Sequence, residues 1–298
     1  METADKNIYV TLILLGIFTA FIFLLFIFNN IDKNKNEDTS LEQEERISFF
    51  ENIEIEAPSV IVFDLDNEKV IFEKNSESQL PLASLAKVLV AKIVFDNNIL
   101  NSNIKITEDF LKEEGDNGLV VNEEWSIKNL SDFTLMESSN DGAKALASAA
   151  VSLGGGTSFI DLMNQEAARL GMKQTYFLNS TGLDESLQVG GAYGSLKDMA
   201  TLFQKTLKEN PELFEASTYP TLNINNHTPE NTNELTKKLP GIIASKTGFT
   251  DLAGGNLVMA FDFGPMKRIL IGVMGSSADG RFTDMEKLYL TALKEINK

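Results

Sequence analysis

The segment Pro81–Phe95, PLASLAKVLVAKIVF, places a serine and a lysine three positions apart at the start of an expected helix. Proline suits a helix entrance, and no helix-breaking residue follows it for fourteen positions. Residues three apart lie on one helix face, with about 5–6 Å between Cβ atoms, so the Lys87 amine can reach the Ser84 hydroxyl. Because residues 88–95 are apolar except for Lys92, we expect this helix to be buried on nearly every side. The pattern indicates a nucleophile beside a base.

The same spacing of serine and lysine occurs a second time, at Ser102 and Lys105. Asparagines surround this second pair, which predicts turns, and no apolar helix follows it. Chance alone produces the spacing about once in a chain of this length and composition. The pair at Ser84 therefore needs support from other parts of the chain.

Composition excludes several classes of function. The 298 residues, 43% of them hydrophobic, are enough to form one large core, and the net charge of −17 disfavours binding to nucleic acid. The absence of cysteine excludes disulfides and thiolate chemistry. A single histidine, His227, leaves no histidine-rich zinc cluster and disfavours a serine–histidine triad, and we expect it in a solvated loop. We expect no metal and no cofactor.

The N-terminal region differs from the rest of the chain. After a tail at residues 1–7, residues 8–28 form a run of 21 without a charge, close to the ~20 needed to cross a bilayer as a helix. A cleaved signal peptide is the alternative, but its apolar region is shorter, ~7–15 residues, and ends in small side chains. Too few charged residues flank the run to predict its orientation across the membrane. We predict a transmembrane anchor, an acidic spacer at 29–56 and a catalytic domain at 57–298.

The order of expected elements predicts the fold class. Residues 59–72 alternate around a short polar turn, which indicates a β-hairpin. Further strands are expected around residues 241–258 and 269–274, and helices at 143–151, 159–170, 196–207 and 284–296. Strands at both ends of the domain with helices between them predict a mixed α/β fold, an antiparallel β-sheet flanked by helices.

Two further motifs accompany Ser84-Leu85-Ala86-Lys87. They are Ser138-Ser139-Asn140, expected on a loop, and Lys246-Thr247-Gly248, expected on a strand. In this order the three motifs resemble those of the penicillin-interacting serine enzymes. Neighbouring segments narrow the resemblance to the serine-type D-alanyl-D-alanine carboxypeptidases, low-molecular-mass penicillin-binding proteins with a DD-peptidase/β-lactamase-like fold. These segments include Met163–Met172, Thr175–Asn179, Gly182–Asp184, Asn231–Asn233 and Lys246–Thr250.

The resemblance implies roles for the first two motifs. Ser84 is the expected nucleophile, and Lys87 is its base. A lysine accepts the serine proton only if its pKa is lowered by desolvation and by a second cation, for which Lys246 is the candidate. Ser138 is expected to pass a proton to the leaving amine, and Asn140 to hydrogen-bond both the substrate backbone and Lys87.

The third motif is implied to bind the substrate. Lys246 and Thr247 are the expected partners of the terminal carboxylate, next to Gly248 in the same motif. The backbone N–H groups of Ser84 and Phe249 are expected to hold the oxyanion. Arg281 is a candidate second partner of the carboxylate, with a surface arginine near the last helix as the alternative.

The implied function is that of a membrane-anchored enzyme that removes the terminal D-alanine from peptidoglycan pentapeptide stems and is acylated by β-lactam antibiotics. Its catalytic domain is then expected outside the cell membrane. A β-lactamase of the same fold that deacylates with a glutamate carries it four residues before an asparagine, whereas Glu166 and Glu185 precede Leu170 and Val189 at that spacing. A DD-endopeptidase and a non-catalytic wall-binding protein stay open as alternatives.

The sequence also departs from the family pattern. Ala86 and Ser180 stand where the family usually has threonine and proline, and the chain ends without the β-rich C-terminal domain of many members. From the last departure we expect the N-terminal span to supply the membrane attachment.

Overall fold

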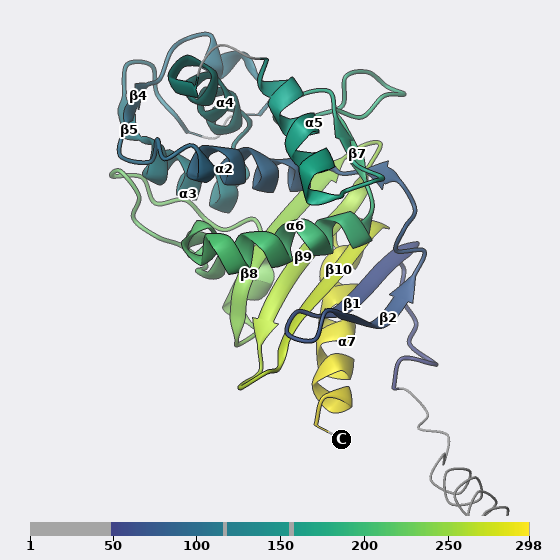
Figure 1. Ribbon diagram of the computed structural model, residues 1–298. Helices are drawn as coiled ribbons and strands as arrows, with labels where there is room; N and C mark the ends of the chain where they lie inside the picture. Colours follow the sequence, from purple (N-terminus) through teal and green to yellow (C-terminus); the bar gives the residue numbers. More distant parts are fainter. Residues whose placement is uncertain (1–48, 116–117, 155–157, 298) are drawn as a thin grey trace, which may run out of the picture. The chain divides into compact units, whose positions relative to one another are not determined.

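The computed structural model describes residues 49–115, 118–154 and 158–297, which belong to one compact unit, Phe49–Lys298 (Figure 1). The expected tail, the anchor at 8–28 and most of the spacer lie outside the described residues. Within the described ranges, no helix has both the length and the apolar character needed to cross a bilayer.

A five-stranded antiparallel sheet in the order β2-β1-β10-β9-β8 forms the centre of the unit (Figure 1). Its strands are β1 (Ser59–Asp64), β2 (Lys69–Lys74), β8 (Ile242–Thr250), β9 (Gly254–Asp262) and β10 (Arg268–Ser276). The N-terminal hairpin joins the C-terminal strands through β1 and β10, from Ser59 opposite Met274 to Asp64 opposite Ile269. The predicted hairpin and antiparallel sheet are confirmed, and β8 is an edge strand.

Helices cover both faces of the sheet. On one face, Ile61 of β1 shares a hydrophobic cluster with helical residues from the middle of the chain; on the other, Val60 and Val62 pack with the C-terminal helix α7 (Gly280–Glu295). This alternation follows from the period of two in a strand. The middle helices are α2 (Ala86–Asp96), α3 (Ile127–Glu137), α4 (Asn140–Gly154), α5 (Phe159–Leu170) and α6 (Leu196–Glu209).

Short elements connect these layers. The strands β3 (Leu80–Pro81), β6 (Tyr176–Phe177) and β7 (Ala192–Gly194) form a small sheet, and β4 (Asn103–Lys105) pairs with β5 (Glu124–Ser126). The 3-10 turns are η1 (Ala83–Leu85), η2 (Phe110–Lys112), η3 (Pro211–Phe214), η4 (Ala216–Thr218) and η5 (Glu234–Lys237).

The first helix begins later than its sequence predicts. Pro81 lies in β3 opposite Tyr193, Ser84 lies in η1, and the α-helix starts only at Ala86. Pairing with β7 holds the proline in extended conformation, so a helix-compatible residue is used in a strand. The prediction that α2 is buried on nearly every side is confirmed, because residues 86–95 are all buried.

Two other expectations are corrected by tertiary contacts. His227 lies in a loop, as expected, but only 22% of its side chain is exposed: its ring is 5.0 Å from that of Trp125, and its Nε2 lies 3.0 Å from a Glu123 carboxylate oxygen. The domain also extends beyond the expected boundary at residue 57, because Phe50 is only 2% exposed and stacks on Phe72 at 4.9 Å. Aromatic packing explains both the partial burial of His227 and the place of Phe50 in the core. Such contacts cannot be predicted from residue spacing along the chain.

Candidate active site

The turn that carries Ser84 is enclosed from two sides. Ala83 has a φ of +49°, and Gly182 packs so closely against it that a Cβ on Gly182 would lie 2.0 Å from the Ala83 carbonyl oxygen. On the other side, a Cβ on Gly248 would lie 3.3 Å from the Ser84 nitrogen. The loop at Gly182 and strand β8 therefore meet at this turn, and both need glycine for the close approach.

Lys87 is fully buried and directs its amine at Ser84. Its Nζ donates to Ser84 Oγ, to Asn140 Oδ1 and to the Thr181 carbonyl oxygen, each at 2.7 Å. Burial lowers the pKa of Lys87 to about 7, while the negative charge of Glu113 opposes this shift. A large share of the amine is therefore neutral near pH 7 and able to accept the serine proton.

The second motif lies at the junction of two helices. Helix α3 ends at Glu137, Ser138 has a left-handed φ of +63°, and Ser139 Oγ accepts from the Gly142 N–H to cap α4. Asn140 is the first residue of α4 and not part of a loop, which corrects the expectation for this residue. Its Oδ1 accepts from Lys87, and its Nδ2 donates to the Glu114 carbonyl oxygen at 2.7 Å.

Strand β8 brings the third motif to the second. Lys246 is 1% exposed, and its Nζ donates to Ser138 Oγ and to the Thr247 carbonyl oxygen at 2.8 Å. Burial lowers the pKa of Lys246 well below its usual value, and the positive charges of Lys87 and Arg281 lower it further. For Lys87, burial is the leading cause of the lowered pKa, so the sequence argument overstated the part played by Lys246.

Arg281 lies in the first turn of α7, against the motif strand. Its Nη1 donates to the Gly248 carbonyl oxygen at 2.7 Å, and its guanidinium lies 4.7 Å from the centre of the Phe282 ring. Its buried Nε has no hydrogen-bond partner among the described residues. Phe249, the residue after the motif, is 49% exposed at the rim of the site. All nine site residues predicted from the sequence therefore lie on η1, α2, the α3–α4 junction, β8 or the start of α7.

Sequence reasoning missed the loop that supports Lys87. Asn179 Oδ1 accepts from the backbone N–H groups of Thr181 and Gly182, and its Nδ2 donates to the Leu183 carbonyl oxygen at 2.9 Å. These bonds orient the Thr181 carbonyl toward Lys87. Asn179 and Gly182 belong to segments that carry the family resemblance, but the Thr181 contact is made by a backbone atom and has no signal in the sequence.

A second missed feature is the segment that follows η2. Glu113 Oε1 pairs with Lys144 Nζ of α4 at 2.6 Å, which brings a negative charge near Lys87, and Glu114 contacts Asn140 as described above. In the described ranges, no group of three or more histidine, cysteine or acidic side chains is arranged to hold a metal ion.

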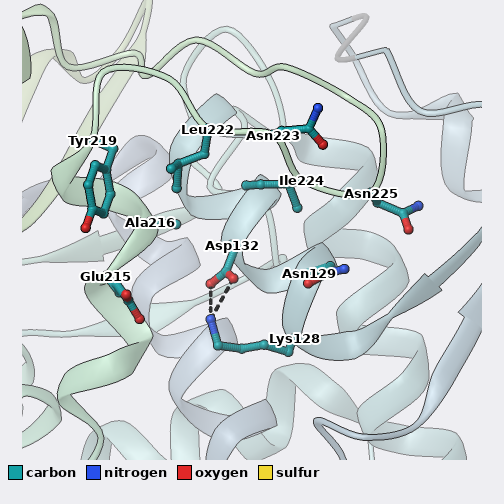
Figure 2. A pocket seen from close by; sticks show the side chains of 10 residues that line it. All are labelled: Lys128, Asn129, Asp132, Glu215, Ala216, Tyr219, Leu222, Asn223, Ile224 and Asn225. Carbon is teal, nitrogen blue, oxygen red and sulfur yellow. Dashed lines mark hydrogen bonds and ion pairs between the residues drawn. The ribbon is translucent and has the colours of Figure 1, made fainter.

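Figure 2 shows a pocket of about 310 Å³ that contains none of the motif residues. Its lining includes Lys128 and Asp132, whose side chains pair at 2.6 Å, and the exposed ring of Tyr219. Burial raises the pKa of Asp132, while the charge of Lys128 opposes that shift. None of the residues that line this pocket is a nucleophile paired with a base, so the pocket is not a second candidate for the site around Ser84.

Comparisons with known proteins agree with this arrangement. Residues 44–278 match the family model of peptidase S11, described as D-alanyl-D-alanine carboxypeptidase. D-alanyl-D-alanine carboxypeptidase DacF of Bacillus subtilis is 30% identical over 232 residues, which cover 74% of this chain and 58% of the relative. The D-alanyl-D-alanine endopeptidase of Pseudomonas aeruginosa is 29% identical over 247 residues, which cover 79% and 76% of the two chains. The chain spans about three fifths of the length of the first curated relatives.

A solved structure extends the likeness to the fold. Penicillin-binding protein D2 of Listeria monocytogenes, in its cefotaxime-bound form, has a TM-score of 0.71 and 28% identity to this chain. The match covers 81% of this chain and 99% of the other. Since the family model matches most of the sequence and the fold agrees, this chain belongs to the D-alanyl-D-alanine carboxypeptidase family, peptidase S11.

Proposed function

We propose that this protein is a peptidoglycan D-alanyl-D-alanine carboxypeptidase that works through an acyl-enzyme on Ser84 and is acylated at the same serine by β-lactam antibiotics. The observation that carries the proposal is the 2.7 Å contact between Ser84 Oγ and the buried Lys87 amine, whose pKa is about 7. A neutral amine beside a serine hydroxyl supplies the base that serine needs to become a nucleophile.

Acylation begins when neutral Lys87 takes the Ser84 proton. Oγ then attacks the carbonyl carbon of the penultimate D-alanine, and the backbone N–H groups of Ser84 and Phe249 stabilise the oxyanion. As the C–N bond breaks, the proton that Lys87 took from Ser84 passes by way of Ser138, which is bonded to Lys246, to the amine of the departing D-alanine, so Lys87 is neutral again. Water then attacks the ester with Lys87 as base, which releases the shortened stem and restores the serine.

The substrate binds along the free edge of β8. An edge strand offers unpaired backbone groups to an extended peptide, so the stem adds as a further strand. Its terminal carboxylate lies beside Thr247, Lys246 and Arg281 at Gly248. A guanidinium held against a strand is suited to bind a carboxylate, because its donors form a rigid fork.

Two alternatives use the same groups. One relative is named as an endopeptidase, and cleavage of a D-alanyl cross-link needs the same nucleophile and base, so this chain can serve that reaction too. A β-lactamase that deacylates with a glutamate needs that carboxylate to activate water at the acyl-enzyme. Glu166 is instead paired with Arg169 at 2.6 Å, and Glu185 accepts from Asn179 at 2.6 Å, which favours the peptidase. A non-catalytic wall-binding protein would not need a lysine buried without a carboxylate partner.

The proposal includes the N-terminal region. Residues 8–28 anchor the protein in the cell membrane after a short tail at 1–7, and the following acidic residues separate the anchor from a catalytic domain on the outer side, where peptidoglycan lies. The test is deletion of residues 1–30. The shortened chain should leave the membrane fraction and still release D-alanine, and loss of its cooperative thermal transition would contradict this division of the chain.

A labelled penicillin tests the catalytic assignment. Ser84→Ala should abolish covalent labelling, because the variant has no nucleophile. Ser102→Ala, which changes the serine of the second pair with the same spacing, should be labelled like the unchanged chain. Equal labelling of the Ser84 variant would overturn the assignment, and D-alanine release from a defined pentapeptide should follow the same pattern.

A further inference from the structure

The pocket of about 310 Å³ in Figure 2 lies between helix α3 and the chain around and after η4. Its volume falls within the range of roughly 300–1,000 Å³ that small-molecule sites occupy. Helix α3 contributes Lys128, Asn129 and Asp132, and the other lining residues come from the segment 215–225. None of the residues proposed for catalysis lines the pocket, so a ligand that enters it binds apart from Ser84.

Four polar side chains of this lining are unpartnered. The amides of Asn129 and Asn223, the carboxylate of Glu215 and the hydroxyl of Tyr219 make no hydrogen bond to any of the described residues. In Figure 2 the dashed lines join only Lys128 and Asp132, although all ten side chains border the same space. The pocket therefore offers donors and acceptors that a ligand can use without breaking an internal contact.

The charges of the pocket argue against an anionic ligand. The cation among the described lining residues is Lys128, and its Nζ donates to both carboxylate oxygens of Asp132 at 2.6 Å. Its positive charge is thus matched, while Glu215 adds a negative one. A phosphate or a carboxylate would be repelled. Neutral amides and a carboxylate suit an uncharged ligand that carries hydroxyl and amide groups, because these groups supply both donors and acceptors.

Tyr219 gives the pocket a flat apolar surface. The residue is 45% exposed, and its main-chain carbonyl oxygen accepts from Asn231 Nδ2 at 2.9 Å, which holds the backbone in place. An exposed tyrosine presents an aromatic face and a hydroxyl together. The face can cover the C–H side of a sugar ring while the hydroxyl bonds to a polar substituent. Leu222, half-buried in the same lining, can contact a methyl group.

We propose that this pocket binds an N-acetylated amino sugar, the kind of unit from which the glycan strand of peptidoglycan is built. The ring of Tyr219 packs on the sugar, and Glu215 accepts from its hydroxyls. Asn129 and Asn223 bond to the acetamido group, whose N–H and C=O match a side-chain amide. Binding of the free sugar is independent of the reaction at Ser84, and only its assignment to peptidoglycan rests on the proposed function. A bound glycan would keep the enzyme close to the stems and raise their effective concentration.

Titration of the full-length chain with N,N′,N″-triacetylchitotriose, followed by saturation-transfer NMR, tests the site. A Kd on the order of 0.1–1 mM is expected, because an open pocket covers only one side of the sugar. Tyr219→Ala should weaken binding about tenfold, through loss of the aromatic face. Asn129→Ala should weaken it about fivefold, through loss of one hydrogen-bonding group. Tyr176→Ala, which removes a 40% exposed tyrosine outside the pocket, should leave the Kd unchanged.

Two other trisaccharides test the chemistry of recognition. Cellotriose has hydroxyls in place of the acetamido groups and should bind about fivefold more weakly. Chitotriose without its acetyl groups carries amines and should also bind more weakly than the acetylated sugar. Tighter binding of this cationic sugar would show that the pocket selects positive charge through Glu215, and equal binding of cellotriose would show that the amides do not read the acetamido group. Either result would overturn the proposal.

The site is separated from the catalytic centre by acylation. A chain acylated by penicillin at Ser84 should bind triacetylchitotriose as the free chain does, and Tyr219→Ala should be labelled by penicillin like the unchanged chain, which also shows that it is folded. If Tyr219→Ala were not labelled, Asn129→Ala would carry the test. No binding by the unchanged chain, equal Kd values in the pocket variants, or loss of binding on acylation would overturn the inference. Failure of penicillin labelling in the unchanged chain would instead remove the proposed function and leave the sugar titration valid.

Discussion

Helix α2 carries two fully buried lysines five positions apart, and their surroundings are opposite. Lys92 Nζ pairs with Asp96 at 2.9 Å and with Glu209 at 2.7 Å, and its pKa is raised by these partners although burial opposes them. Lys87 has a hydroxyl, an amide oxygen and a backbone carbonyl as hydrogen-bond partners, and burial lowers its pKa to about 7.

The difference shows that burial alone does not make a lysine a base. Two carboxylates at 37% and 43% exposure are enough to keep Lys92 charged, so it links α2 to α6 as a structural cation. Lys87 donates its hydrogen bonds to uncharged oxygens, with no negative charge in contact, and therefore its neutral form is accessible near pH 7. The same residue type on the same helix is a structural cation at Lys92, whereas at Lys87 it is the base of the proposed reaction.

The largest expected effect comes from replacing each lysine by arginine. Arginine stays protonated at any working pH, so Lys87→Arg should lower the penicillin acylation rate by about 10²–10⁴. Lys92→Arg keeps a cation for Asp96 and Glu209 and should acylate within a fewfold of the unchanged chain. Stopped-flow acylation with a fluorescent penicillin measures both, and a near-normal rate for Lys87→Arg would show that Lys87 is not the base.

The support of Lys87 by the loop at Thr181 can be tested with two glycines of similar backbone conformation. Gly182 and Gly171 have φ values of +78° and +77°, but only a Cβ on Gly182 meets the Ala83 backbone. Gly182→Ala should slow acylation about 10- to 100-fold, because small displacements of reacting groups are costly. Gly171→Ala should cost about 1–2 kcal/mol of stability and leave the acylation rate unaltered. Equal acylation rates in the two variants would argue that the loop does not position the base.

Removing the carboxylates of Lys92 should make it resemble Lys87. Asp96→Asn with Glu209→Gln leaves a buried cation without a counter-charge, at a cost of about 2–3 kcal/mol, less than for fully buried pairs because both carboxylates are partly exposed. In the unchanged chain the pKa of Lys92 is raised, so its stabilising contribution is complete below 10.5 and lost as the pH rises through the folded pKa. Urea unfolding should therefore show a deficit at pH 7 that shrinks above pH 10.5. A deficit independent of pH would mean that the pair acts by packing alone.

The smallest expected effect concerns the acidic limb of the pH–rate profile. In the unchanged chain acylation should rise through a pKa of about 7, because only neutral Lys87 accepts the serine proton. Glu113→Gln removes a negative charge that raises the pKa of Lys87, so the limb should move to lower pH while the plateau rate is largely kept. Asp109→Asn, which alters the exposed pair with Lys112, is the control and should leave the limb in place. A shift to higher pH with Glu113→Gln would contradict this role of the charge.

Most of the architecture could be predicted from local pattern. The hairpin at residues 59–72, the amphipathic helix at 159–170 and the apolar strand at 269–274 each have a period that identifies the element, and the structure has them at nearly these bounds. The boundaries that were wrong depend on distant partners. Pro81 is extended because it pairs with Tyr193, and Phe50 belongs to the core because it stacks on Phe72.

The sequence by itself determined the family: three short motifs in a fixed order, with a buried helix behind Ser84, indicate it, and the nine proposed site residues follow from that resemblance. Only the tertiary structure decided how they work. The contact of the Thr181 carbonyl with Lys87 and the ion pair of Glu113 with Lys144 join segments far apart in the chain, and neither leaves a periodic signal. The protonation states of the two lysines on α2 also depend on such contacts. Each pKa is set by burial and by neighbouring charges, and these exist only after folding.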